Sequence, residues 1–200
     1  MRLLDVARHK TRLGRQPFGL AFQPGGSRIA VGFVDSQAVE MLGGQSLTPL
    51  AAPDVAGIAN GDLFSIEWSR DGRRLYAGGR YDVGGRGPVV AWAGGGQGPR
   101  SRLFSGALST IMSLKALPGG ELLVAAGDPH LALLAADGTP RWAKPSPKFD
   151  PRDQRQNFAV SADGATVEFG FVYGGEKRVH FDLRQLKLVK AAAPAGAVAP

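Results

Sequence analysis

Apolar and polar residues alternate with period two through most of the chain, and turns that contain glycine interrupt the alternation. Four of these turns read QPGG, SRDG, LPGG and SADG, and their closing glycines, spaced 46, 48 and 44 residues apart, are Gly26, Gly72, Gly120 and Gly164. The tip of a tight hairpin needs a residue that tolerates a positive φ, which explains why glycine recurs. The spacing therefore predicts a structural repeat.

The residues on either side of each turn predict two strands. Positions eight, six and four residues before the glycine are apolar except at Gln156: Phe18, Leu20 and Phe22; Phe64, Ile66 and Trp68; Met112, Leu114 and Ala116; Phe158 and Val160. Positions three and five residues after it are also apolar: Ile29 and Val31; Leu75 and Ala77; Leu123 and Ala125; Val167 and Phe169. Such alternation is typical of strands. The small residues six positions past the glycine, which indicate close packing of a neighbouring backbone, are Gly32, Gly78, Ala126 and Gly170.

Two further strands are predicted in each repeat. The third strands are expected at residues 38–42, 88–93, 131–135 and 177–183, and weaker fourth strands at 47–50, 101–104, 140–142 and 186–190. Residues 2–6 match a third strand and residues 11–15 a fourth, so we expect the chain to begin halfway through a repeat. Four short strands per repeat are typical of a β-propeller blade. Helical repeats are excluded because they need apolar spacings of three and four.

We therefore predict an all-β fold, a β-propeller with an N-terminal half blade and about four full four-stranded blades. The predicted ranges are a half blade at 1–16, blades at 17–60, 61–108, 109–155 and 156–190, and an Ala/Pro-rich linker at 191–200. Rings typically need four to eight blades. Closure requires neighbouring sequence, a four-bladed ring with a spare half blade, or a second chain. We favour neighbouring sequence and a larger ring, because terminal repeats are normally atypical and these are not.

The repeats resemble the WD-repeat family. SRDG and SADG are close to its S-P-D-G hairpin, Phe181-Asp182 and Leu4-Asp5 are similar to its Trp-Asp pair, and Asp35 falls at the position of its structural Asp. Asp82 and Asp128 are each displaced from that position by one residue, and the family's Gly-His pair is absent, so its complete hydrogen-bond network is not expected. The resemblance covers nearly the whole chain and implies a WD-repeat propeller.

The last repeat supports a narrower resemblance. FAVSADGATVEFGF, followed by RVHFDL and an Ala/Pro-rich tail, is similar to the WD-repeat regions of large bacterial proteins that also carry a caspase-like peptidase domain. No peptidase residue lies in this chain. The resemblance therefore implies a part that senses, binds or regulates rather than cleaves.

Composition narrows the classes of function. The chain has no cysteine, which excludes disulfides, thiolate metal sites and a thiol nucleophile within it. The net charge of +7 comes mostly from scattered arginines, and the densest basic group lacks aromatic partners for stacking, so a solvated loop is favoured there over nucleic-acid binding: Arg8, Lys10, Arg12 and Arg15. Without a secretion signal or a long apolar stretch, we expect a cytoplasmic protein without membrane contact.

No motif predicts catalysis, a metal site or a cofactor. The string AGGGQGPRS at 93–101 differs from a phosphate-binding loop, because Pro99 replaces its second glycine and Arg100 its lysine, and a flexible outer hairpin is expected instead. The histidines His9, His130 and His180 share no zinc spacing. Asp35, Asp82 and Asp128 occupy similar places in three blades, where they suit either a cation-binding ring or, as we favour, hydrogen bonds from nearby backbone amides.

The leading hypothesis is a non-catalytic scaffold or sensor propeller, a regulatory part of a larger bacterial protein that binds a protein partner or other domains of the same polypeptide. The expected contact segment, residues 144–156, offers four basic side chains and one apolar anchor: Lys144, Lys148, Arg152, Arg155 and Phe149. Arg80 and Arg86 in RYDVGGRG form a weaker candidate. The alternative is a propeller enzyme of the lactonase or hydrolase type with a metal held by channel carboxylates.

Overall fold

The computed structural model describes residues 8–128, 130–145, 159–169 and 179–189. The chain divides into two compact units, residues 1–152 and 153–200. Every sheet is antiparallel, and the helical structure in the described residues is one short 3₁₀ turn. Within those same residues there is no helix with the length and apolar character needed to cross a membrane.

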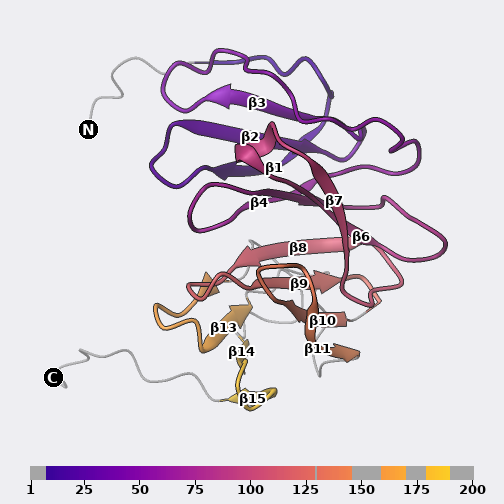
Figure 1. Ribbon diagram of the computed structural model, residues 1–200, viewed down its shortest axis with the longest axis vertical. Helices are drawn as coiled ribbons and strands as arrows, with labels where there is room; N and C mark the ends of the chain where they lie inside the picture. Colours follow the sequence, from indigo (N-terminus) through magenta and orange to yellow (C-terminus); the bar gives the residue numbers. More distant parts are fainter. Residues whose placement is uncertain (1–7, 129, 146–158, 170–178, 190–200) are drawn as a thin grey trace, which may run out of the picture. The chain divides into compact units, whose positions relative to one another are not determined.

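The first unit contains three sheets (Figure 1). The first sheet has the order β1 (Pro17–Phe22), β2 (Arg28–Phe33) and β3 (Val39–Gly43). The second has the order β4 (Ser65–Trp68), β5 (Leu75–Gly78), β6 (Pro88–Trp92) and β7 (Arg100–Phe104), with the 3₁₀ turn η1 (Gly94–Gly96) between β6 and β7. The third comprises β8 (Ile111–Ala116), β9 (Leu122–Ala126), β10 (His130–Leu134) and β11 (Pro140–Pro145).

The second unit is built on one four-stranded sheet. Its strands are β12 (Ala159–Val160), β13 (Thr166–Phe169), β14 (Val179–Asp182) and β15 (Lys187–Val189), in that order across the sheet. The prediction of an all-β chain with four-stranded antiparallel sheets is confirmed for three of the four sheets.

The four repeat turns are alike in the structure. In each, the closing glycine donates its N–H to the carbonyl three residues earlier, at distances of 2.8 to 3.0 Å. The glycine φ angles lie between 68° and 89°, in the left-handed region where other residues are strained: Gly26, Gly72, Gly120 and Gly164. In the two S-x-D-G turns, the serine hydroxyl also donates to the aspartate at 2.6 Å, from Ser69 to Asp71 and from Ser161 to Asp163.

Two strands expected from the sequence are not formed. Residues 47–50 make only an isolated bridge between Pro49 and Leu42, so the first sheet has three strands. Pro49 has no N–H to donate to a ladder, and Leu47 has a φ of 53°, which breaks an extended backbone. Residues 11–15 form no strand either. The strand expected at 2–6 lies outside the described residues.

The core of the first unit lies between neighbouring sheets. Between the first and second sheets, Trp68 and Trp92 are buried and donate their indole N–H groups to the Ala21 and Asp54 carbonyls, at 3.1 and 2.7 Å. A second cluster joins the second and third sheets. A Cβ at Gly32 would lie 2.4 Å from the Leu63 carbonyl oxygen. The backbones of the first and second sheets are therefore in direct contact at this position. This is the close approach that the small residue predicts.

Candidate interaction surfaces

The aspartates singled out by the repeat pattern hold backbone amides. Asp35, after β2, accepts from the N–H groups of Arg15 and Gln16 before β1, at 3.0 and 3.1 Å. Asp128, after β9, accepts from Leu108 before β8 at 2.9 Å. Each therefore ties the end of a second strand to the segment that leads into the first strand of the same sheet.

Asp82 has a different place. Its carboxylate accepts from the Gly85 N–H at 3.1 Å, inside the hairpin that joins β5 to β6. The three aspartates thus do not share one structural position. In the part of the chain that the structure describes, no three His, Cys, Asp or Glu residues are grouped as a metal ion would require.

The second sheet uses Asp62, which the sequence pattern did not single out. Asp62 precedes β4, is buried, and accepts from the backbone N–H of Arg80 at 2.9 Å. The Arg80 guanidinium also binds this carboxylate and donates to the Val34 carbonyl, so the residue links the first and second sheets. A buried carboxylate needs such partners. The missed signal was an acidic residue 18 positions before an arginine that lies two residues past the end of β5, the second strand of this sheet.

The other residues expected to contact a partner, five basic and one aromatic, are distributed as follows. Arg86 is exposed in the β5–β6 hairpin, whose Gly84 and Gly85 have φ angles of 60° and 78°. Lys144 is half-buried on β11. The remaining four lie outside the described residues: Lys148, Phe149, Arg152 and Arg155.

The N-terminal segment 8–16 lies against the first sheet. His9 Nε2 is 2.8 Å from the buried Glu40 on β3, whose other carboxylate oxygen accepts from the Arg12 N–H at 3.0 Å. Gly14 sits directly on Phe33, because a Cβ there would come within 2.3 Å of the ring. The arginine and lysine side chains of the segment are exposed, as the expected solvated loop requires, while its backbone packs against β2 and β3.

Three apolar side chains on β1, an edge strand of the same sheet, are exposed. Phe18, Leu20 and Phe22 on β1 are 69%, 57% and 58% exposed. Their repeat equivalents, of which the last two lie on β4 and the first directly before it, are only 6%, 2% and 3% exposed: Phe64, Ile66 and Trp68. We call Phe18, Leu20 and Phe22 the open row. A contiguous apolar row of this kind is typical of an interaction site.

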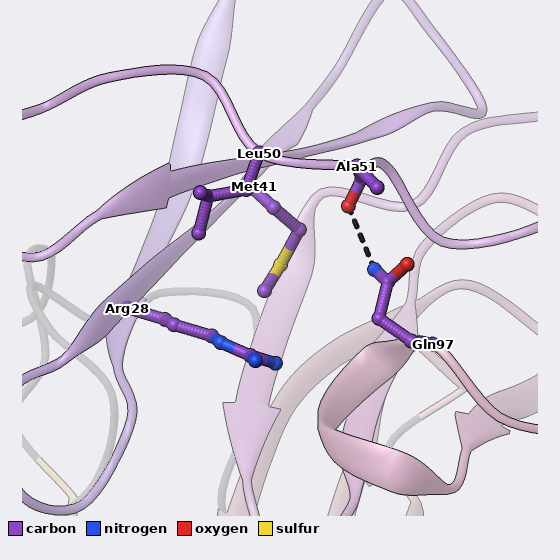
Figure 2. Close-up of a pocket in the computed structure, with 5 residues that line it drawn as sticks. All are labelled: Arg28, Met41, Leu50, Ala51 and Gln97. Atoms are coloured by element: carbon purple, nitrogen blue, oxygen red, sulfur yellow. Dashed lines mark hydrogen bonds between the residues drawn. The ribbon is translucent and has the colours of Figure 1, made fainter.

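A small cavity lies between the first sheet and the β6–β7 hairpin. Figure 2 shows its lining, which encloses about 200 Å³: Arg28, Met41, Leu50, Ala51 and Gln97. Arg28 donates to the Gly95 carbonyl at 3.0 Å, and Gln97 donates to the Ala51 carbonyl at 2.7 Å. The Gly95 N–H in turn donates to the Arg73 carbonyl at 2.7 Å. The glycine-rich string was expected to be a flexible hairpin. In the structure it instead packs between the first and second sheets and forms hydrogen bonds there.

Comparisons with known proteins show the fold. A scan against protein-family models finds no match, and a search of the curated proteins finds none either. Among solved structures, the chain is similar to hydrazine synthase from Kuenenia stuttgartiensis, at 15% identity and a TM-score of 0.69 over 94% of this chain. It is also similar to the WD40 repeats of RRP9, at 13% identity, a TM-score of 0.64 and 90% coverage.

A third similar structure is the β-propeller domain of Cps50 (Swd1) from Myceliophteria thermophila, at 17% identity, a TM-score of 0.61 and 89% coverage. The chain spans 52% of the hydrazine synthase and RRP9 chains and 55% of the Cps50 chain. Structural similarity at such low sequence identity shows the fold of the chain but not its function. The fold is a β-propeller of the WD40 type.

Proposed function

We propose that this chain is a non-catalytic interaction module, part of a larger propeller ring that acts as a scaffold or sensor. Its partners are a protein or other domains of the same polypeptide, and its setting is the bacterial cytoplasm. The resemblance of the last repeat to propellers fused to a caspase-like peptidase supports a regulatory role. The hydrogen bonds from backbone amides to Asp35 and Asp128 also support a structural use of these carboxylates.

The open row carries the proposal. Its side chains occupy the repeat positions of Phe64, Ile66 and Trp68. Ile66 and Trp68 pack into the core between the first and second sheets, and Phe64 is buried with its ring 5.2 Å from that of Phe18. Full burial of an aromatic or aliphatic side chain stabilises a protein by about 1.5–3 kcal/mol. The exposed apolar side chains of β1 have the same repeat positions as those through which β4 packs against the first sheet. A further sheet of the same type can therefore pack against β1 in the same way. The occupant is therefore a further blade of the same ring.

Hydroxyl-radical footprinting of Phe18, Leu20 and Phe22 tests this proposal. The measurement compares the 200-residue chain with the complete polypeptide encoded by its gene. We expect the three side chains to become as unreactive in the complete polypeptide as Phe64 is in both samples. Leu108, which is exposed before β8, serves as the internal control and keeps its reactivity. An open row that stays fully reactive in the complete polypeptide contradicts a docked blade.

A thermal-shift titration with calcium, manganese and zinc tests the non-catalytic part. We expect no large rise in melting temperature. A large rise that disappears in Asp35→Ala would instead support a metal-dependent enzyme.

A further inference from the structure

A cleft opens between neighbouring repeat turns in the first unit. One wall is the β4–β5 hairpin, and the other combines the β8–β9 and β10–β11 turns. The cleft encloses about 490 Å³, and the residues that line it are Ser69, Arg70, Asp71, Arg73, Arg74, Tyr76, Pro118, Gly119, Gly120 and Ala136. We call it the hairpin cleft.

The first wall is basic. It carries three guanidinium groups and one carboxylate, Asp71. That carboxylate accepts from the Ser69 hydroxyl at 2.6 Å and from the Arg73 N–H at 3.0 Å, and the serine hydrogen bond holds the pKa of Asp71 below its usual value. The Arg73 side chain lies 4.0 Å from Asp71, but both are exposed, so solvent screens the pair. The wall keeps a net positive charge.

Arg74 spans the cleft. Its guanidinium donates to the Ala136 carbonyl in the β10–β11 turn. A guanidinium has five N–H donors, so this contact leaves others for a bound anion. Burial raises the pKa of the Tyr76 hydroxyl, against the opposing charge of Arg74.

The residues that line the second wall are small and uncharged, although the Glu121 carboxylate lies against Gly119. Pro118, Gly119 and Gly120 are exposed and present almost no side chain, which suits close approach of another backbone. Glu121 and Asp137 lie on the same turns but are not among the residues that line the cleft. Asp137 accepts from the N–H and the hydroxyl of Thr139, at 2.9 and 2.7 Å.

We propose that the hairpin cleft binds an extended acidic peptide segment of a partner protein, with Arg70, Arg73 and Arg74 contacting carboxylate or phosphate oxygens. The planar guanidinium matches both oxyanions, and the Pro-Gly-Gly wall accommodates the peptide backbone. Nucleic acid fits less well, because the aromatic residue in the lining, Tyr76, is buried and cannot stack on a base. This inference rests on the proposed function and names the chemistry of the partner.

The test is fluorescence anisotropy with a fluorescein-labelled peptide of alternating Glu and Ser residues, unphosphorylated or phosphorylated on serine. We expect saturable binding that weakens about tenfold or more in the double variant Arg70→Ala, Arg73→Ala, the loss of roughly one charge-assisted contact. The matched control is Arg8→Ala, Arg15→Ala, which removes the same charge from exposed side chains elsewhere and leaves the affinity nearly unchanged. Both variants keep the melting temperature.

The outcomes separate the sources of the anion. Equal affinity of the two peptides assigns the site to carboxylates, and tighter binding of the phosphorylated peptide, with competition by inorganic phosphate, assigns it to phosphate groups. Equal weakening in both double variants, or binding that does not saturate, overturns the proposal. Preferential binding of an oligothymidylate through Arg70 and Arg73 also overturns it. Failure here leaves the footprint of the open row unchanged, so the two proposals fail separately.

Discussion

β1 and β4 carry the same alternation of apolar side chains and have opposite environments. On β4 and at the residue directly before it, the side chains eight, six and four residues before the turn glycine are buried, whereas on β1 they form the open row. β4 is bounded by β1 on one side and β8 on the other, while β1 has one such neighbour among the described strands of the first unit. The comparison shows that stacking between repeats, rather than the repeat itself, buries the apolar face.

The largest difference in stability between the two strands is expected when Trp68 and Phe22 are each truncated to alanine. Trp68→Ala opens a cavity between two sheets and removes the hydrogen bond to Ala21, so we expect a loss of about 3–5 kcal/mol in the free energy of unfolding. Phe22→Ala, at the equivalent position, should change it by less than about 0.5 kcal/mol. Urea denaturation followed by circular dichroism measures both. Similar losses at the two positions would show that β1 is covered.

The segments that lead into the two strands offer a second contrast. Asp62, before β4, is buried, and Asp35, which anchors the segment before β1, is exposed. Asp62→Ala removes a buried carboxylate together with the hydrogen bonds that it accepts from Arg80, and should cost about 1–3 kcal/mol. Asp35→Ala should cost less, because water replaces the carboxylate. Thermal unfolding of the two variants under identical conditions provides the comparison, and a greater loss in Asp35→Ala would contradict it.

A charged residue introduced into the open row tests whether this row forms intermolecular contacts, and it should leave the fold intact. Leu20→Asp should change the free energy of unfolding by less than about 0.5 kcal/mol. It should also remove the concentration-dependent self-association that we expect of the wild-type row in sedimentation velocity. Leu108→Asp is the control, because Leu108 is similarly exposed and lies outside the row. Self-association that survives Leu20→Asp would place the contact on another surface.

The smallest effect concerns Glu67, which stands on β4 at the repeat position of Ala21 on β1. Burial raises the pKa of Glu67, against the opposing charge of Lys115, whose ammonium is 3.7 Å away. The folded chain therefore binds the proton more tightly than the unfolded chain. The stability of the wild type relative to Glu67→Gln should be greatest below pH 4.5 and fall as the pH rises through the folded pKa. Urea midpoints measured from acidic to neutral pH check the sign.

The sequence predicted the strands around each turn because period two and the turn glycines are local signals. Pro49 and Leu47 show where the fold departs from the repeat, since a missing N–H and a positive φ end a strand that the register alone would place there. The burial of Trp68 and the exposure of Phe22 could not be separated, because the two residues have the same local pattern.

Long-range contacts limited the prediction of the site. The Arg80 guanidinium, expected to meet a partner, binds Asp62 and Val34 through contacts that span 18 and 46 residues. The hairpin cleft likewise combines turns from neighbouring repeats. The sequence does contain a signal for this cleft. The string SRDGRR in one repeat aligns with LPGGE in the next, which places a turn rich in arginine beside a turn of proline and glycine.

The indole hydrogen bonds described for the core have a spectroscopic consequence. The chain has three tryptophans, and two of them, Trp68 and Trp92, are buried in one interface with their N–H groups bound to backbone carbonyls. The third, Trp142, is half-buried on β11. The blue-shifted part of the intrinsic emission therefore reports on the seam between the first two sheets. Separation of those sheets should shift the emission to the red before the remaining strands lose their far-ultraviolet signal.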